Sequence, residues 1–287
     1  MRRILGSALP LALAAALLHG GIAQAATSDP LRDLQWGLDQ VRAEEAWTTT
    51  KGAGAVVAVV DTGVDFAHPD LKANLLQGAT FTGCMGQSPC GNGDWKGPDG
   101  EGNDLDEHGT HVSGIVAAVT DNGIGVAGTA PDAKVMPIKA LEEGSGAFED
   151  IAAGITYAIA AGNGLFGLFA LDACTQSPAR VPEAITVSAT NSGDAKPSWA
   201  NRGTCVDVFA PGINITSTWN TGATATNTIS GTSMAAPHVA GAAALYLAGN
   251  PQATPAQVHA AIVGGATTGV VTSPGTGSPN RLLYTGG

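Results

Sequence analysis

The sequence is poor in charged residues, and basic residues are the scarcer kind. Only 13% of the 287 residues are charged, and 24 Asp and Glu outnumber 13 Lys and Arg, which gives a formal net charge of −11. So low a charged fraction argues against a disordered chain or a coiled coil. The acidic balance excludes general nucleic-acid binding, which needs a basic face for the phosphates. With 44% hydrophobic residues, the chain can still bury a sizeable core.

Long apolar runs are also missing, except at the start of the chain. Arg2 and Arg3 precede an apolar stretch over 4–18, and the small residues Ala23-Gln24-Ala25 follow it. This three-part pattern predicts a secretory signal peptide at 1–25. The alternative is an uncleaved membrane anchor, but the stretch is shorter than the roughly 20 apolar residues of a spanning helix. We therefore expect a secreted, extracellular protein that comprises residues 26–287 and does not associate with membranes after cleavage.

Cysteine is scarce, with four residues that allow three pairings. Export favours disulfides over free thiols, although free buried thiols are the alternative. Cys84 and Cys90 bracket a short loop that contains Gly and Pro, which predicts a local pair. Cys174 would then pair with Cys205.

Short apolar runs rich in valine predict a parallel sheet. Ala55–Val60 is typical of a strand buried on both faces. Further strands are expected at Val135–Lys139, Ala184–Ala189 and Val206–Ala210, and helices at Val112–Ala118 (starting near His108), Phe148–Gly154, Met234–Leu247 and Pro255–Ile262. Periodicity does not decide between helix and strand for Ile155–Ala161. Strands that alternate with helices, with no internal repeat or linker, predict one α/β domain with a mainly parallel central sheet flanked by helices, in three layers.

Three short motifs carry the residue types of nucleophilic catalysis. They are VVDTGV with Asp61 at a strand end, HGTHVSG with His108 at a helix start, and GTSMAAPH with Ser233 at a helix N-terminus. A serine hydroxyl is a weak nucleophile, so an imidazole must take its proton, and a carboxylate must fix the tautomer of that imidazole. The order Asp, His, Ser differs from the Ser, Asp, His order of α/β-hydrolases.

These motifs, in this order, resemble those of the subtilisin-like serine proteases, the subtilases, and weaker similarity covers most of residues 29–265. The resemblance implies a serine endopeptidase that acts on polypeptides through an acyl-enzyme. Ser233 would be the nucleophile, His108 the general base and Asp61 the orienting acid. The alternatives are that Ser233 is a helix cap, that His108 is a structural histidine and that Asp61 is a turn carboxylate. We expect His111 to be structural, and His68, His238 and His259 to be structural or exposed.

The region before Asn163 departs from the family. Ala160-Ala161-Gly162-Asn163 resembles the turn that carries the oxyanion donor in this family. The resemblance implies that Asn163 is this donor and that Ile155–Ala161 is a strand. The alternative is that Asn163 is an asparagine in an ordinary turn. The interval from His108 to Asn163 is shorter than in subtilisin by about 36 residues, the size of one helix–strand unit.

No Ser-Leu-Gly-Gly occurs, although the family uses such a strand to line the substrate cleft. The fold is therefore expected to lack one helix–strand unit, which would leave the neighbouring strands without backbone partners. The apolar run Gly164–Leu171 is expected to be an inserted loop that covers exposed surface. The interval from Asp61 to His108 is longer than in subtilisin, which indicates an insertion around Cys84 and Cys90.

The chain also resembles the thermitase-like subtilases, which carry a calcium site near the N-terminus. The resemblance implies six oxygen ligands, from the carboxylates of Asp29 and Asp70, the amide of Asn122 and the backbone carbonyls of Val119, Ile124 and Val126. Six oxygens meet the requirement of Ca²⁺. The alternative is that these are ordinary surface groups. The acidic stretch Asp99–Glu107 is expected to be a solvated loop, and the alternative is that it holds another ion.

Two hypotheses of different class follow. The first is a secreted, monomeric serine endopeptidase. The second is a degenerate subtilase that keeps the triad residues, lacks a complete cleft and acts as a binding protein; the short interval before Asn163 favours it. An esterase of another serine-hydrolase fold is a third hypothesis, which the triad order disfavours.

Overall fold

The computed structural model describes residues 27–83, 103–147, 151, 159–160, 170–176 and 179–286. Several predictions fall outside these ranges: the signal peptide at 1–25, the Cys84–Cys90 pair, most of the Phe148–Gly154 helix, Asn163, and 164–169 of the apolar run. They stay predictions.

Helices and strands alternate along the described chain. The helices are η1 (Arg32–Leu34), α1 (Trp36–Val41), α2 (Ala43–Trp47), α3 (His108–Ala117), η2 (Ala173–Thr175), α5 (Thr232–Gly249) and α6 (Pro255–Gly265). The strands are β1 (Val56–Asp61), β2 (Ala79–Thr80), β3 (Lys134–Lys139), β4 (Ile159–Ala160), β5 (Thr186–Thr190), β6 (Val208–Pro211), β7 (Ile215–Thr218), β8 (Thr226–Ile229), β9 (Thr267–Thr268) and β10 (Arg281–Leu282). The expected alternation is confirmed, and β4 shows that Ile155–Ala161 contains a strand.

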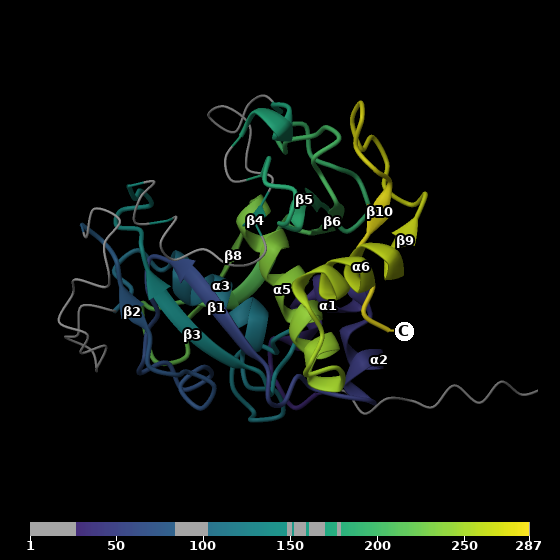
Figure 1. Ribbon diagram of the computed structural model, residues 1–287. Helices are drawn as coiled ribbons and strands as arrows, with labels where there is room; N and C mark the ends of the chain where they lie inside the picture. Colours follow the sequence, from purple (N-terminus) through teal and green to yellow (C-terminus); the bar gives the residue numbers. More distant parts are fainter. Residues whose placement is uncertain are drawn as a thin grey trace, which may run out of the picture.

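The parallel strands form two separate sheets, with a β7–β8 hairpin beside them. One sheet has the order β1-β3-β2 and the other the order β4-β5-β6-β10-β9, with only β9 antiparallel to its neighbour. Figure 1 shows the first sheet on the left, the second at the upper right, and the helices α3 and α5 between and behind them. The expected α/β fold with a mainly parallel sheet and flanking helices is therefore confirmed.

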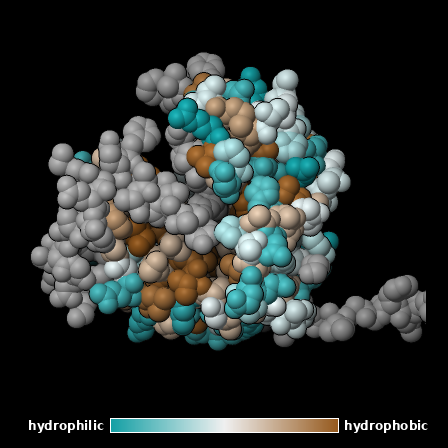
Figure 2. All heavy atoms as spheres, viewed as in Figure 1, coloured by the Kyte–Doolittle hydropathy of each residue, from teal (hydrophilic) through white to brown (hydrophobic). Residues whose placement is uncertain are grey.

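The break between the two sheets lies between β1 and β4. Within the described ranges, β1 pairs only with β3, and β4 pairs only with β5. Along the chain, the sequence predicts a missing helix–strand unit between β3 and β4, and much of that segment lies outside the described ranges. The prediction that Ala55–Val60 is buried on both faces is wrong in part: Val59 is buried, whereas Val56 is 52% exposed. Among the described strands β1 lies at an edge of its sheet, and Figure 2 shows hydrophobic residues gathered at the surface where β1 and β3 lie.

The helix α5 holds the two sheets together from one side. It packs against α3 and against strands of both sheets, including β1, β5 and β6. Its small residues permit close approach: a Cβ at Gly241 would clash with the side chain of Thr129. Ala235, Val239 and Ala242 of α5 join the largest apolar cluster, which also contains Val187 and Val208 from β5 and β6. The relative placement of the two sheets therefore depends on α5, because no described strand bridges them.

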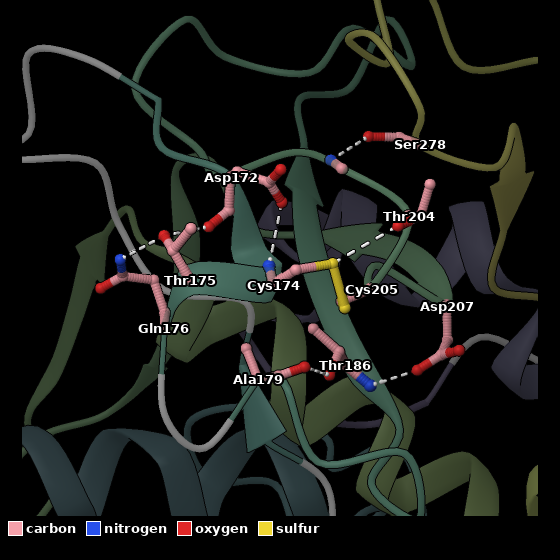
Figure 3. Close-up of a disulfide and its surroundings, with 11 residues drawn as sticks. Asp172, Cys174, Thr175, Gln176, Ala179, Thr186, Thr204, Cys205, Asp207 and Ser278 are labelled. Carbon is pink, nitrogen blue, oxygen red and sulfur yellow. Dashed lines mark hydrogen bonds between the residues drawn. A yellow bond between two sulfur atoms is a disulfide. The ribbon is translucent and has the colours of Figure 1, made fainter.

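The predicted Cys174–Cys205 disulfide is confirmed, with 5.2 Å between the two Cα atoms and a sequence separation of 31. It attaches η2 to the chain that leads into β6 (Figure 3). The Asp172 carboxylate accepts a hydrogen bond from the Cys174 N–H at 3.0 Å and so caps η2. Beneath the disulfide, Ala173, Val206 and Phe209 belong to one buried apolar cluster.

Replacement of both Cys174 and Cys205 by Ser should lower the free energy of unfolding by about 2–4 kcal/mol, because the unfolded chain loses its cross-link. Urea unfolding followed by circular dichroism measures the change. The control is Thr175→Ala, which removes an exposed hydroxyl hydrogen bond in the same 3-10 helix. An unchanged unfolding midpoint in the double Ser variant would show that the disulfide does not stabilise the fold.

Candidate functional site

Asp61 is the last residue of β1, at the carboxyl end of a parallel strand. It is 7% exposed, and its backbone carbonyl accepts hydrogen bonds from Ala140 N–H at 2.9 Å and Leu141 N–H at 3.1 Å. Its carboxylate oxygen Oδ1 accepts a hydrogen bond from the N–H of Thr62 at 2.8 Å. Backbone pairing and this local hydrogen bond fix the direction in which the carboxylate points.

His108 is the first residue of α3, and its ring faces Asp61. The Nδ1 atom lies 2.8 Å from Asp61 Oδ1. Since an ionised carboxylate only accepts hydrogen bonds, Nδ1 carries the proton and Nε2 is left as the basic nitrogen of the neutral ring. Burial alone would lower the pKa of His108, but the charge and hydrogen bond of Asp61 and the charges of Asp104 and Asp106 raise it.

Ser233 is the second residue of α5 and is half-buried. The next residue, Met234, packs against Ile115 and Val112 of α3, so the first turn of α5 lies against the helix that carries His108. In the described part of the chain, no hydrogen bond joins Ser233 to His108. Catalytic hydrogen bonds are often long in unliganded structures and shorten when substrate binds. The structure therefore joins Asp61 to His108 directly and places Ser233 on an adjacent helix.

The other buried histidines have structural roles, as expected. His111 lies one turn after His108, and its Nε2 is 3.1 Å from the Ile215 carbonyl and 3.2 Å from the Asn227 carbonyl. Burial lowers the pKa of His111 to about 4, so the ring is neutral. His238 Nδ1 donates to the Met234 carbonyl at 2.8 Å within α5, and burial lowers its pKa to about 4 as well.

The expectation of a solvated loop at Asp99–Glu107 is wrong for Asp104, which is 2% exposed. Its carboxylate accepts hydrogen bonds from Thr62 and Thr110, which flank the Asp61–His108 pair. The sequence signal that would have found it is weak, because an acidic run gives no indication of which carboxylate turns inward. Burial is possible here because threonine hydroxyls and backbone N–H groups replace the lost water.

The residues of the expected calcium site lie together. Asp29 is 4% exposed and Asp70 is fully buried. Asn122 joins them: its N–H donates to Asp29 Oδ1 at 3.2 Å and its side-chain amide donates to Asp70 Oδ1 at 2.8 Å. The Val119 N–H donates to the Asp70 carbonyl, and the Val126 N–H donates to Asp70 Oδ2. The Ile124 N–H donates to the Asn122 side-chain oxygen at 2.7 Å.

The charges of this cluster fit a cation. Burial raises the pKa of Asp70 to about 6, and the nearby charge of Asp29 adds to this effect. No lysine or arginine in the described ranges forms an ion pair with either carboxylate. Among the described residues there is no group of three His, Cys, Asp or Glu that could hold a metal. A metal here would accordingly need backbone and amide oxygens in addition to the two carboxylates.

No helix in the part of the chain that the structure describes is long and apolar enough to span a membrane.

The sequence model of the Subtilase family matches residues 52–168 and 153–282. An extracellular serine proteinase from Thermus sp. (strain Rt41A) is 40% identical over 294 residues, covering 87% of this chain and 66% of that protein. Thermitase from Thermoactinomyces vulgaris is 36% identical over 242 residues, covering 74% of this chain and 81% of that protein. An alkaline serine exoprotease A from Vibrio alginolyticus is 35% identical, and the chain spans only 50% of its length.

Solved structures agree with the sequence relatives. A cold-adapted subtilisin-like serine proteinase superposes with a TM-score of 0.70 at 30% identity, over 87% of this chain and 97% of that chain. A protease from Pseudoalteromonas arctica PAMC 21717 superposes with a TM-score of 0.75 at 29% identity, over 91% of this chain and 97% of that chain. Family motifs, relatives and fold lead to one conclusion: the chain belongs to the subtilase family.

Proposed function

We propose that the protein is a secreted serine endopeptidase that hydrolyses peptide bonds of polypeptide substrates. The observation that carries the proposal is the 2.8 Å hydrogen bond from His108 Nδ1 to the buried Asp61 carboxylate. It joins the end of β1 to the start of α3 and leaves Nε2 free to accept a proton. The names of the relatives as serine proteinases support the same activity.

In the proposed reaction, His108 Nε2 takes the proton of the Ser233 hydroxyl as Oγ attacks the carbonyl carbon of the scissile bond. The resulting imidazolium is stabilised by Asp61 and returns the proton to the leaving amine, which breaks the C–N bond and leaves an acyl-enzyme. A water molecule, deprotonated by the same nitrogen, then hydrolyses the ester. Asn163 is proposed to donate a hydrogen bond to the oxyanion, a contribution of about 2.7–4 kcal/mol where one such donor has been removed in subtilisin.

The second candidate function is a degenerate subtilase that binds polypeptides without cleaving them. The break between β1 and β4 favours it, because the strand that lines the cleft in this family would lie there. The two candidates share the fold and differ in whether Ser233 is reactive. In either case we propose secretion after loss of residues 1–25, a monomeric state, and no nucleic-acid or membrane partner.

We also propose a structural calcium ion at the cluster of Asp29, Asp70 and Asn122. The two carboxylates would supply charge, and the amide of Asn122 and the carbonyls of Val119, Ile124 and Val126 would complete the oxygen ligands. A bound cation would stabilise the folded protein by offsetting the repulsion between two buried carboxylates. It would take no part in peptide hydrolysis.

A fluorophosphonate probe should label the folded protein, and Ser233→Ala should abolish labelling, because the probe reacts with an activated serine hydroxyl. Intact-protein mass spectrometry measures the adduct. Ser230→Ala is the matched control, since Ser230 is an exposed serine just before α5. Labelling of Ser233→Ala at the wild-type rate would identify another nucleophile, and failure to label well-folded wild-type protein would favour the degenerate subtilase.

The rate of labelling should fall as the pH drops through the raised pKa of His108, because only the neutral ring accepts the serine proton. This fall is the acid limb of the pH–rate profile. Asp61→Asn should move this acid limb to lower pH, because it removes the negative charge that raises the pKa of His108. It should also lower the rate by about 10⁴-fold, because the ring loses the partner that fixes its tautomer. Labelling rates across pH test both effects, and an unchanged profile in Asp61→Asn would contradict the role of Asp61.

Calcium should raise the melting temperature, and a chelator should lower it. Saturation at about 100 times Kd would stabilise the fold by about 2.7 kcal/mol. Asp70→Asn should abolish this calcium dependence, whereas Asp121→Asn should preserve it, because the Asp121 side chain is 51% exposed and pairs with Lys51. Differential scanning calorimetry distinguishes these cases; equal melting temperatures with calcium and with chelator would exclude the site.

A further inference from the structure

Asp104 is a buried carboxylate beside the Asp61–His108 pair, and the proposed reaction does not use it. It is 2% exposed and precedes α3. Its Oδ1 accepts hydrogen bonds from the Thr62 hydroxyl at 2.8 Å and the Asp106 N–H at 3.0 Å. Its Oδ2 accepts from the N–H of Thr110 at 2.8 Å and from the hydroxyl of Thr110 at 2.6 Å. No lysine or arginine of the described chain pairs with it, so within the described residues these donors compensate the buried charge.

The charge of Asp104 sets the direction of two threonine hydroxyls. A hydroxyl has one proton to donate, and an ionised carboxylate can only accept. Thr62 and Thr110 therefore both donate to Asp104 and turn their lone pairs away from it. The lone pairs accept backbone N–H groups of the opposite segment: Gly109 N–H donates to the Thr62 hydroxyl at 2.9 Å, and Asp65 N–H donates to the Thr110 hydroxyl at 3.0 Å.

The two hydroxyls thus cross-link the segment after β1 with the first turn of α3. Thr62 follows Asp61, and its N–H donates to the same Oδ1 atom that accepts the proton of His108 Nδ1. Gly109 follows His108, and a Cβ there would clash with the carbonyl of Gly63, so the two segments are in direct contact. A shift in either segment changes the Asp61–His108 distance.

We propose that Asp104 is a positioning residue of the triad: by fixing the hydroxyls of Thr62 and Thr110, it holds Asp61 and His108 in register for proton transfer. The proposal rests on the proposed function. An asparagine at position 104 has nearly the same shape but presents an N–H₂ group in place of one oxygen. One donor from Thr62 or Thr110 would then face another donor, and the cross-link would loosen on that side.

Asp106 offers a matched control for charge. Among the described residues, the charged and titratable groups around His108 are Asp61, Asp104, Asp106 and, one turn along α3, His111. The charges of Asp104 and Asp106 both raise the pKa of His108. The Asp106 carboxylate, however, accepts a hydrogen bond from the Glu143 N–H and does not bond to either threonine hydroxyl. Asp106→Asn therefore removes a nearby charge and leaves the cross-link in place.

The test is the rate of fluorophosphonate labelling as a function of pH. Both Asp104→Asn and Asp106→Asn should move the acid limb to lower pH. Only Asp104→Asn should also lower the rate on the high-pH plateau, by about 100-fold, the loss expected for a misplacement of about 1 Å. A plateau in Asp104→Asn equal to that of Asp106→Asn would overturn the proposal, because it would show that Asp104 acts through its charge alone.

A second pair of variants separates positioning from global misfolding. Thr62→Val keeps both shape and charge while removing the hydroxyl, and it should lower the plateau without moving the acid limb. Thr62→Ser keeps the hydroxyl and should restore the rate. In Asp104→Asn/Thr62→Val the losses should be less than additive, since both substitutions break one interaction. A wild-type plateau rate in Thr62→Val would contradict the cross-link. Fully additive losses of rate in the double variant would contradict it as well.

Proton NMR tests the cross-link independently of activity. The proton between His108 Nδ1 and Asp61 gives a downfield resonance, which should weaken through faster exchange in Asp104→Asn and persist in Asp106→Asn. Equal resonances in the two variants would overturn the positioning role even if the wild-type protein were active. A different outcome is that the wild-type protein fails to react with the fluorophosphonate while the resonance still weakens in Asp104→Asn and persists in Asp106→Asn. That result would overturn the proposed function and would still support the positioning role of Asp104.

Discussion

The hydrogen bond between His108 Nδ1 and Asp61 Oδ1 is the interaction on which the site depends. It spans 2.8 Å and joins the carboxyl end of β1 to the first residue of α3. Both partners are fixed by their own elements, Asp61 by backbone pairing at the end of a strand and His108 by its position at a helix start. The geometry of the pair is therefore a consequence of how α3 sits against the end of β1.

Several contacts hold α3 in that place without involving any strand between β1 and β4. The hydroxyl of Ser217 donates to the His111 carbonyl, and the hydroxyl of Thr218 donates to the Thr110 carbonyl, each at 2.8 Å. A Cβ at Gly114 would clash with these two side chains, so β7 and α3 are in close contact. The α3–α5 packing adds the helix that carries Ser233. The described contacts that position Asp61 and His108 therefore do not depend on a strand between β1 and β4.

Motifs in the sequence predicted the residues that the fold brings together. VVDTGV and HGTHVSG place Asp61 and His108 at element ends that meet, because a parallel strand and the following helix of an α/β fold share one edge of the sheet. The helix–strand unit expected to be missing before Asn163 stays a prediction, because most of residues 148–163 lie outside the described ranges. The Cys174–Cys205 pair was predicted by elimination, after Cys84 and Cys90 were assigned to each other, and the structure contains it.

Burial was harder to predict than position. The valine-rich run of β1 indicated a strand buried on both faces, yet Val56 is exposed, because the tertiary fold decides what covers a strand. The error for Asp104 is the opposite one. The acidic run indicated a solvated loop, whereas the Asp104 carboxylate is buried and accepts hydrogen bonds from the hydroxyls of Thr62 and Thr110. Both errors arise from tertiary partners that no local pattern encodes.

We propose that Asp61, His108 and Ser233 act as one catalytic unit. An experimental structure of the protein after reaction with a fluorophosphonate would test this proposal. We expect phosphonylated Oγ on Ser233, with His108 Nε2 within hydrogen-bond reach of it, about 2.6–3.2 Å, and Nδ1 still bonded to Asp61. An unmodified Ser233, or a Ser233 beyond the reach of His108, would contradict it.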